Sequence, residues 1–184
     1  MSELAERFRT VAAGFTQRVE AVPERDWSQP SPCEGWDARD VVRHLVEWVP
    51  PFLQAGTGID LPRGPSVDVD PVGAWRSLSA SVQSILDDPE QSAMMFRHDR
   101  AGTHRLDEAI GMFVLGDVLV HTWDLAKAAR LDDTLDPAEV YGMRVGLEGM
   151  GEALVASGHY APAVAVSDDA DEQTRLLALT GRRA

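Results

Sequence analysis

The sequence has a single cysteine, Cys33, and far fewer basic than acidic residues. One cysteine excludes an intramolecular disulfide and a cysteine-rich zinc site, which favours a reduced, cytoplasmic setting. Lys and Arg number 17 against 30 Asp and Glu among 184 residues, so the formal net charge is −13. Nucleic acids and anionic membranes are bound through concentrated positive charge, so the sequence predicts neither as a partner.

The sequence also lacks a secretory signal. Glu3 and Glu6 stand where a signal peptide would have a basic segment followed by an apolar one. No uninterrupted apolar run approaches the length needed to cross a bilayer. We therefore expect a cytoplasmic protein with one domain, residues 1–184, because a chain of this length buries a core of its own.

Apolar residues recur at intervals of three and four along most of the chain, which predicts an all-α fold. Asp37, Asp70 and Asp136 stand where helix N-caps are expected. A loop is expected over 55–70 and a short extended piece over 94–97. The predicted helices span about 2–22, 38–52, 71–88, 105–130, 136–158 and 171–180.

The long helices favour a four-helix bundle, with a C-terminal extension of about residues 137–184 packed on it. The predicted helix 105–130 is unusual, because its only charged side chains between Ile110 and Leu125 are Asp117 and Asp124. It must be buried on nearly every side.

A buried carboxylate such as Asp117 costs several kcal/mol unless it is paired or binds a metal. The nearest basic residues, Lys127 and Arg130, lie well down the helix, so the alternative is an ion pair with an arginine from elsewhere. If Asp117 is an unpaired anion without metal, Asp117→Asn should leave the metal-free protein at least as stable as its parent.

Asp117 and His121 are four residues apart, so both project from one helix face. His44 lies on the same face of its helix as Val41 and Trp48, and it therefore points inward. Taken alone, an inward histidine is more often a core residue with a hydrogen-bond partner. Together, the two histidines and the carboxylate predict a site for one divalent transition metal, with positions open for water or substrate. Zn is the first choice, with Ni or Fe as alternatives.

Other residues have subsidiary roles. Asp124, three residues after His121, is expected to accept a hydrogen bond from that imidazole, with a salt bridge or helix packing as the alternative. Trp36 and Trp123 are expected to pack in the core rather than to form a substrate platform.

Cys33 precedes a helix N-terminus, but no base is visible beside it in the sequence, so we interpret it as structural. Three histidines near loops or helix ends are expected to be exposed: His98, His104 and His159. His104 is a further candidate for a fourth metal ligand.

The segments PSPCEGWDARDVVRHLVEW and GDVLVHTWDLAKA resemble the two signature segments of the DinB-like superfamily, specifically its actinobacterial, mycothiol-dependent maleylpyruvate isomerase branch. The ending PAVAVSDDADEQTRLLALTGR is similar to that of short, single-domain members. The resemblance implies a DinB-like four-helix bundle with His44, Asp117 and His121 at the metal-ligand positions, and mycothiol as the thiol.

Two departures limit what the resemblance implies. Relatives with isomerase activity often have Glu where this chain has Asp117, and they have an additional C-terminal domain for which this chain has no room. Metal binding is therefore expected to carry over, and isomerase activity is not.

The expected function is a metal-dependent transfer or isomerisation that uses a small-molecule thiol and an electrophilic substrate. The alternatives are a metal-binding bundle without catalysis and a non-haem Fe(II) enzyme. Catalytic and cofactor-binding residues stay unassigned, and the sequence is compatible with a homodimer.

Overall fold

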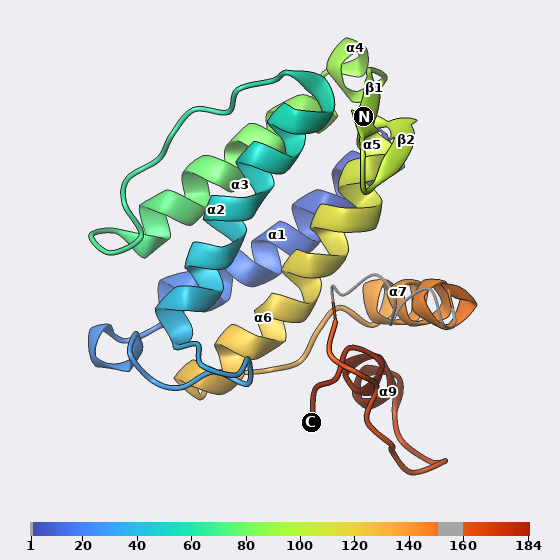
Figure 1. The fold of residues 1–184 in the computed structure, drawn as a ribbon. Coiled ribbons are helices and arrows are strands. Elements are labelled where there is room, and N and C mark those ends of the chain that lie inside the picture. The colour runs from blue at the N-terminus through green and yellow to red at the C-terminus, as the bar shows by residue number, and fades with distance from the viewer. Residues whose placement is uncertain (1, 151–159) are drawn as a thin grey trace. The chain divides into compact units, whose positions relative to one another are not determined.

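The computed structural model describes residues 2–150 and 160–184 (Figure 1). The chain divides into two compact units, Met1–Asp133 and Thr134–Ala184. The described residues are helical apart from one small hairpin and the connecting loops, so the predicted all-α class is confirmed. The packing of the predicted extension 137–184 on the bundle, as one domain, stays a prediction.

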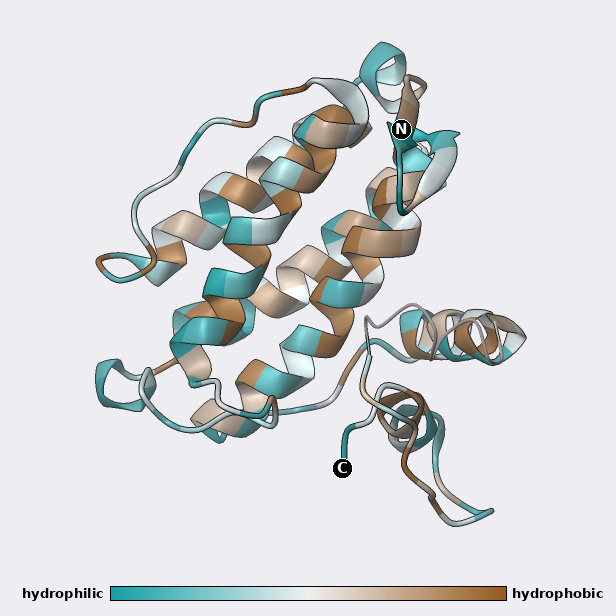
Figure 2. Ribbon diagram, in the orientation of Figure 1, coloured by the Kyte–Doolittle hydropathy of each residue, from teal (hydrophilic) through white to brown (hydrophobic). Residues whose placement is uncertain are grey.

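The first unit is built on a four-helix bundle. Its helices are α1 (Glu3–Ala21), α2 (Ala38–Thr57), α3 (Pro71–Asp87) and α6 (Gly116–Ala129). Helices α1 and α2 each contact both α3 and α6. Apolar and polar residues alternate around these helices, as expected for amphipathic helices that share a core (Figure 2). The largest fully buried side chains of this core include Phe8, Phe15, Leu45, Leu53, Trp75 and Trp123.

The predicted N-caps are present. Asp37 forms a capping box with Asp40, and Asp70 accepts a hydrogen bond from the backbone N–H of Gly73. A short 3₁₀ helix, Glu24–Asp26, lies in the loop between α1 and α2. These caps fix where α2 and α3 begin, and therefore where His44 falls on α2.

Helix α2 continues past its predicted end at residue 52, through Pro50 and Pro51. The two prolines have no N–H to donate to the carbonyls one turn earlier, so a break was expected there. Packing overrides this cost, because Leu53 and Gly56 are buried on the next turn. The helix ends at Gly58, whose φ of 79° suits glycine, and the predicted loop therefore begins after Thr57 rather than at residue 55.

A hairpin follows the short helix α4 (Pro89–Ser92). Its strands are β1 (Met95–His98) and β2 (Gly102–Arg105), which pair antiparallel. The predicted extended piece corresponds to β1, whereas β2 was missed because its residues are mostly exposed and lack an apolar alternation. Phe96 is fully buried, and its ring lies where a Cβ on Gly56 would stand. This contact ties the hairpin to the end of α2.

The predicted helix 105–130 is a composite of three segments. It consists of α5 (Leu106–Ala109), a π-helical segment (Ile110–Leu115) and α6, which ends at Arg130 in the left-handed conformation. The stretch Leu106–Ala129 is long and apolar enough to cross a membrane, but 78% of its most apolar window is buried inside the protein. A core helix of a bundle passes the same test, so this stretch is weak evidence for a membrane span.

The second unit contains α7 (Pro137–Met150) and α9 (Glu172–Leu179), which pack together. Arg144 on α7 reaches Glu172 on α9 at 2.6 Å. The predicted short C-terminal helix is therefore present, and Gly181 follows it with a φ of 81°. The predicted continuation of the 136–158 helix beyond Met150, through Leu154 to Gly158, and His159 lie outside the described residues.

Candidate metal centre

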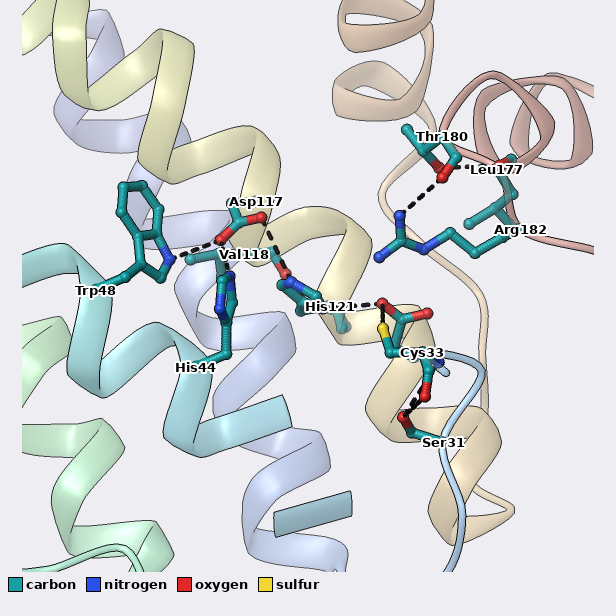
Figure 3. A network of polar contacts seen from close by, with 12 residues as sticks. Ser31, Cys33, His44, Trp48, Asp117, Val118, His121, Leu177, Thr180 and Arg182 are labelled. Atoms are coloured by element: carbon teal, nitrogen blue, oxygen red, sulfur yellow. Dashed lines mark hydrogen bonds and ion pairs between the residues drawn. The ribbon is translucent and has the colours of Figure 1, made fainter. Parts of the chain in front are cut away.

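Three side chains from two facing helices converge in the first unit (Figure 3). His44 comes from α2, and Asp117 and His121 come from one face of α6. His44 Nε2 lies 3.1 Å from Asp117 Oδ2, and His121 Nε2 lies 3.4 Å from Asp117 Oδ1. The convergence expected from the sequence is observed, and the role of these residues as metal ligands stays a prediction.

These distances fit a metal ion. Zn–N and Zn–O bonds of 2.0–2.2 Å in a tetrahedron place the ligand atoms about 3.3–3.6 Å apart. The separations of 3.1 Å from His44 to Oδ2 and 3.4 Å from His121 to Oδ1 are close to this range, although they involve different oxygens of Asp117. One ligand atom from each residue lies within 4.8 Å of the others. Three protein ligands leave at least one coordination position for water or substrate.

The three groups differ in exposure, and this indicates where a ligand would enter. The side chain of His121 is 5% exposed, that of Asp117 is 17% exposed and that of His44 is 30% exposed. The core therefore closes the site behind His121. Solvent reaches it beside His44 and Asp117.

The other ring nitrogen of His121 faces Asp124. His121 Nδ1 lies 2.8 Å from Asp124 Oδ2, and Asp124 is fully buried. This is the contact that the sequence predicted, and it fixes the imidazole orientation with Nε2 toward Asp117. Its role in supporting a metal ligand stays a prediction.

Cys33 has a neighbour that the sequence did not reveal. Its Sγ lies 3.4 Å from Asp124 Oδ2, so a carboxylate that was not visible from the sequence lies beside this thiol. The two residues are 91 positions apart, and helical spacing carries no information on such a contact. Cys33, His121 and Asp124 form a second group of potential metal ligands. The 2.8 Å contact of Asp124 is a hydrogen-bond length and involves Nδ1 of His121, the ring nitrogen that does not face Asp117, so we interpret this group as hydrogen bonded.

Asp117 and His121 form a charged pair in the metal-free protein. Burial raises the pKa of Asp117, but the charge of His121 and hydrogen bonds with His121 and His44 outweigh it, so the pKa lies well below its usual range. Burial lowers the pKa of His121, yet Asp117, Asp124 and Cys33 together raise it well above its usual value. A proton on His121 Nε2 occupies the lone pair that a metal would need, so the two compete.

The ion-pair partner of Asp117 is therefore histidine. Neither lysine nor arginine pairs with Asp117 in the part of the chain that the structure describes. The alternative of an arginine reaching this carboxylate is not supported.

Trp48 was missed as part of the site. Its Nε1–H donates a hydrogen bond to Asp117 Oδ2 at 2.8 Å (Figure 3). From the sequence, Trp48 was expected only to share the inward face of its helix with Val41 and His44. Its position four residues after His44 indicates only that both side chains lie on one face of α2, because the residue of α6 that they meet depends on the register between the two helices.

Of the two other tryptophans considered from the sequence, Trp123 is 1% exposed, and its expected place in the core is confirmed. Trp36 is half-buried, with its ring centroid 5.0 Å from that of His44 and 5.8 Å from that of His121. It covers both predicted ligands, a position that core packing alone did not predict.

The hairpin histidines do not join the site. His104 Nε2 contacts the carbonyl oxygen of Ala101 at 2.7 Å. Neither His98 nor His104 belongs to a ligand group within the described ranges, and both are half-buried rather than exposed. The structure thus does not support His104 as a fourth ligand.

Comparison with protein-family models matches residues 8–126 to the mycothiol maleylpyruvate isomerase N-terminal domain. The matched range is more than half of the chain, and it includes His44, Asp117 and His121. Searches of curated proteins and of solved structures found no match.

Proposed function

Because the chain belongs to the mycothiol maleylpyruvate isomerase N-terminal domain family, we propose that it binds one divalent transition metal through His44, Asp117 and His121 and uses it in a thiol-dependent transfer or isomerisation. The observation that carries this proposal is the convergence of these three groups at separations of 3.1 and 3.4 Å in a part-buried position.

We take zinc as the first candidate for the metal, with nickel or iron as alternatives. Two imidazole nitrogens and one carboxylate oxygen suit all three ions. When bound, the metal supplies a Lewis acid that favours the thiolate form of a small-molecule thiol, which is the nucleophile.

The chain's own residues supply the remaining requirements. Asp117 contributes the negative charge that partly balances the ion, and Asp124 holds His121 through its Nδ1–H. Burial of His121 excludes water from the core side, while the exposed edge of His44 leaves an approach for the thiol and an electrophilic substrate. Mycothiol as the thiol, and a cytoplasmic setting, rest on the family and on the sequence.

The test begins with elemental analysis of protein purified without added metal, followed by titration of chelator-treated protein with Zn²⁺, Ni²⁺ and Fe²⁺. About one equivalent of tightly bound metal is expected from three converging ligands. A chelator-treated protein that takes up no metal would overturn the proposal.

Catalysis is tested separately with mycothiol, by following loss of free thiol to an electrophile, which reports transfer, and conversion of maleylpyruvate to its isomer, in which the thiol adds and is released unchanged. Either reaction should require both protein and metal. Stoichiometric metal without thiol chemistry would instead support the non-catalytic alternative. Dioxygen consumption by the iron form would support the Fe(II) enzyme.

A further inference from the structure

We propose that Trp48 is a positioning residue of the metal centre, whose indole N–H holds the carboxylate of Asp117 in the orientation in which it ligates the ion. The inference rests on the proposed metal site at His44, Asp117 and His121. It assigns to Trp48 a role that helical spacing did not suggest.

The contact is short and rigidly held. Trp48 Nε1 lies 2.8 Å from Asp117 Oδ2, across the interface between α2 and α6. The indole is flanked on its own helix by His44, at 6.0 Å between ring centroids, and by Phe52, at 5.2 Å. These neighbours one turn away on each side restrict the indole to its present orientation.

The need for Trp48 follows from the donors available to Asp117. In the metal-free protein, the carboxylate contacts His44 Nε2 and His121 Nε2 as well as Trp48. A metal takes the Nε2 lone pair of each histidine, so neither nitrogen then carries a proton to donate. Among the described residues, three side chains contact this carboxylate, and two of them are the predicted ligands His44 and His121. Trp48 is the third, and it keeps its N–H when a metal binds.

An indole N–H is suited to this role because it is a donor without an acceptor and without charge. It cannot ligate the metal or repel it. With Oδ2 held by Trp48, rotation of the carboxylate about its Cβ–Cγ bond is restricted, and Oδ1 stays directed toward His121. Removing the N–H frees that rotation and leaves the carboxylate to be ordered by the ion alone.

The variant that tests this is Trp48→Phe, which keeps an aromatic ring and removes the N–H. Zn²⁺ affinity, measured by competition with a chromogenic chelator, should fall about 10- to 100-fold, the range for losing a hydrogen-bond partner of a metal ligand. The matched control is Trp75→Phe, because Trp75 Nε1 donates a bond of the same 2.8 Å length to Thr16 on the other side of the bundle. The folded fraction of Trp75→Phe should bind Zn²⁺ with the affinity of the parent protein.

A second readout separates positioning from packing. The indole N–H resonance of Trp48 in the full-length parent should shift on addition of Zn²⁺, while that of Trp75 should not. Parent-level Zn²⁺ affinity in Trp48→Phe, or equal losses in both variants, would overturn the role of Trp48 and leave the metal site standing. A parent that binds no Zn²⁺ would overturn the proposed function itself, so the two failures are distinguishable.

Discussion

Two tryptophans donate hydrogen bonds of the same length on opposite sides of the bundle. Trp75 on α3 donates to the hydroxyl of Thr16 on α1 at 2.8 Å, and Trp48 on α2 donates to the carboxylate of Asp117 on α6 at 2.8 Å. Trp75 is 1% exposed and packs edge-on against Phe15. Trp48 is half-buried and lies beside His44.

The acceptors make the difference. Thr16 is neutral, and its hydroxyl also donates to the carbonyl oxygen of Ala12, so the α1/α3 contact is complete within the protein. Asp117 is charged, partly exposed and flanked by two imidazoles that can exchange protons for a metal. The same indole bond thus serves packing in one half of the bundle and is proposed to serve ligand binding in the other. The charge and solvent exposure of the acceptor, rather than the length of the hydrogen bond, distinguish the contact of Trp48 from that of Trp75.

The largest expected effect is that of His121→Ala on the α2/α6 side. Stoichiometric metal binding should be abolished, because the best-buried ligand and its contact with Asp124 are both removed. Most of the helix should persist, because alanine favours helix. Metal content and circular dichroism measured side by side check this, and metal at the parent level would show that the ligand assignment is wrong.

The next effect is that of Asp117→Asn, which keeps the shape of the side chain and removes its charge. Metal affinity should fall by more than the roughly 100-fold that marks the loss of a ligand's partner, because a charged ligand is lost. Chelator competition against the parent measures this. An unchanged affinity would show that Asp117 is not a metal ligand and serves only as the ion-pair partner of His121.

The structure reverses the stability expected of this variant. From the sequence, removing a buried anion at Asp117 is expected to leave the metal-free protein at least as stable as its parent. In the structure it is paired with His121, and its pKa lies well below the usual range, which means that folding favours its ionised form. Metal-free Asp117→Asn should therefore be less stable near neutral pH, by about 2 kcal/mol. Denaturant unfolding of chelator-treated protein checks this, with Thr16→Val as the uncharged counterpart on the α1/α3 side.

The shared face of Asp117 and His121 was predictable because the relevant geometry is local, and the role of these residues as ligands stays a prediction. Asp117 and His121 share a face whatever the partner helix, and the mostly apolar sequence of α6 predicts that this face is buried. The contacts of Trp48 with Asp117 and of Cys33 with Asp124 depend on the register between segments 69 and 91 positions apart, which helical periodicity does not encode.

Local rules failed in the fold where packing outweighed them. Pro50 and Pro51 predicted the end of α2, yet burial of the following turn extends the helix to Thr57. The π-helical segment Ile110–Leu115 has an unbroken apolar sequence, so no residue marks the wider turn. The four helices of the bundle, and the N-caps of α2 and α3, by contrast follow from patterns within a few residues of each other.

A smaller effect, about tenfold per pH unit, is expected for metal affinity on the α2/α6 side. The pKa of His121 is higher in the folded than in the unfolded protein. The stability that His121 gives the metal-free protein is therefore complete below its unfolded pKa of about 6.5, and it is lost as pH rises through the folded pKa. The stability that Asp117 gives has the opposite pH dependence: it is present above about pH 3.9 and is lost as pH falls through the depressed folded pKa of Asp117.

Since one proton must leave His121 for a metal to bind, Zn²⁺ affinity should rise about tenfold per pH unit until the folded pKa of His121 is passed. Titration calorimetry in buffers of different ionisation enthalpy measures the released proton. A pH-independent affinity with no proton release would contradict the charged pair.

The smallest effect on metal binding, none, is expected for Thr16→Val on the α1/α3 side. Valine has nearly the shape of threonine but no hydroxyl, so the N–H of the buried Trp75 loses its acceptor. An unsatisfied buried donor costs about 1–3 kcal/mol, and this loss should be the same at every pH because neither partner titrates. Denaturant unfolding measures the stability, and chelator competition measures the Zn²⁺ affinity of the same preparation. A parent-like Zn²⁺ affinity together with reduced stability would separate the two indole contacts cleanly. A variant that lost metal would show instead that the α1/α3 packing sets the spacing of α2 and α6, so that the two halves of the bundle form one functional unit.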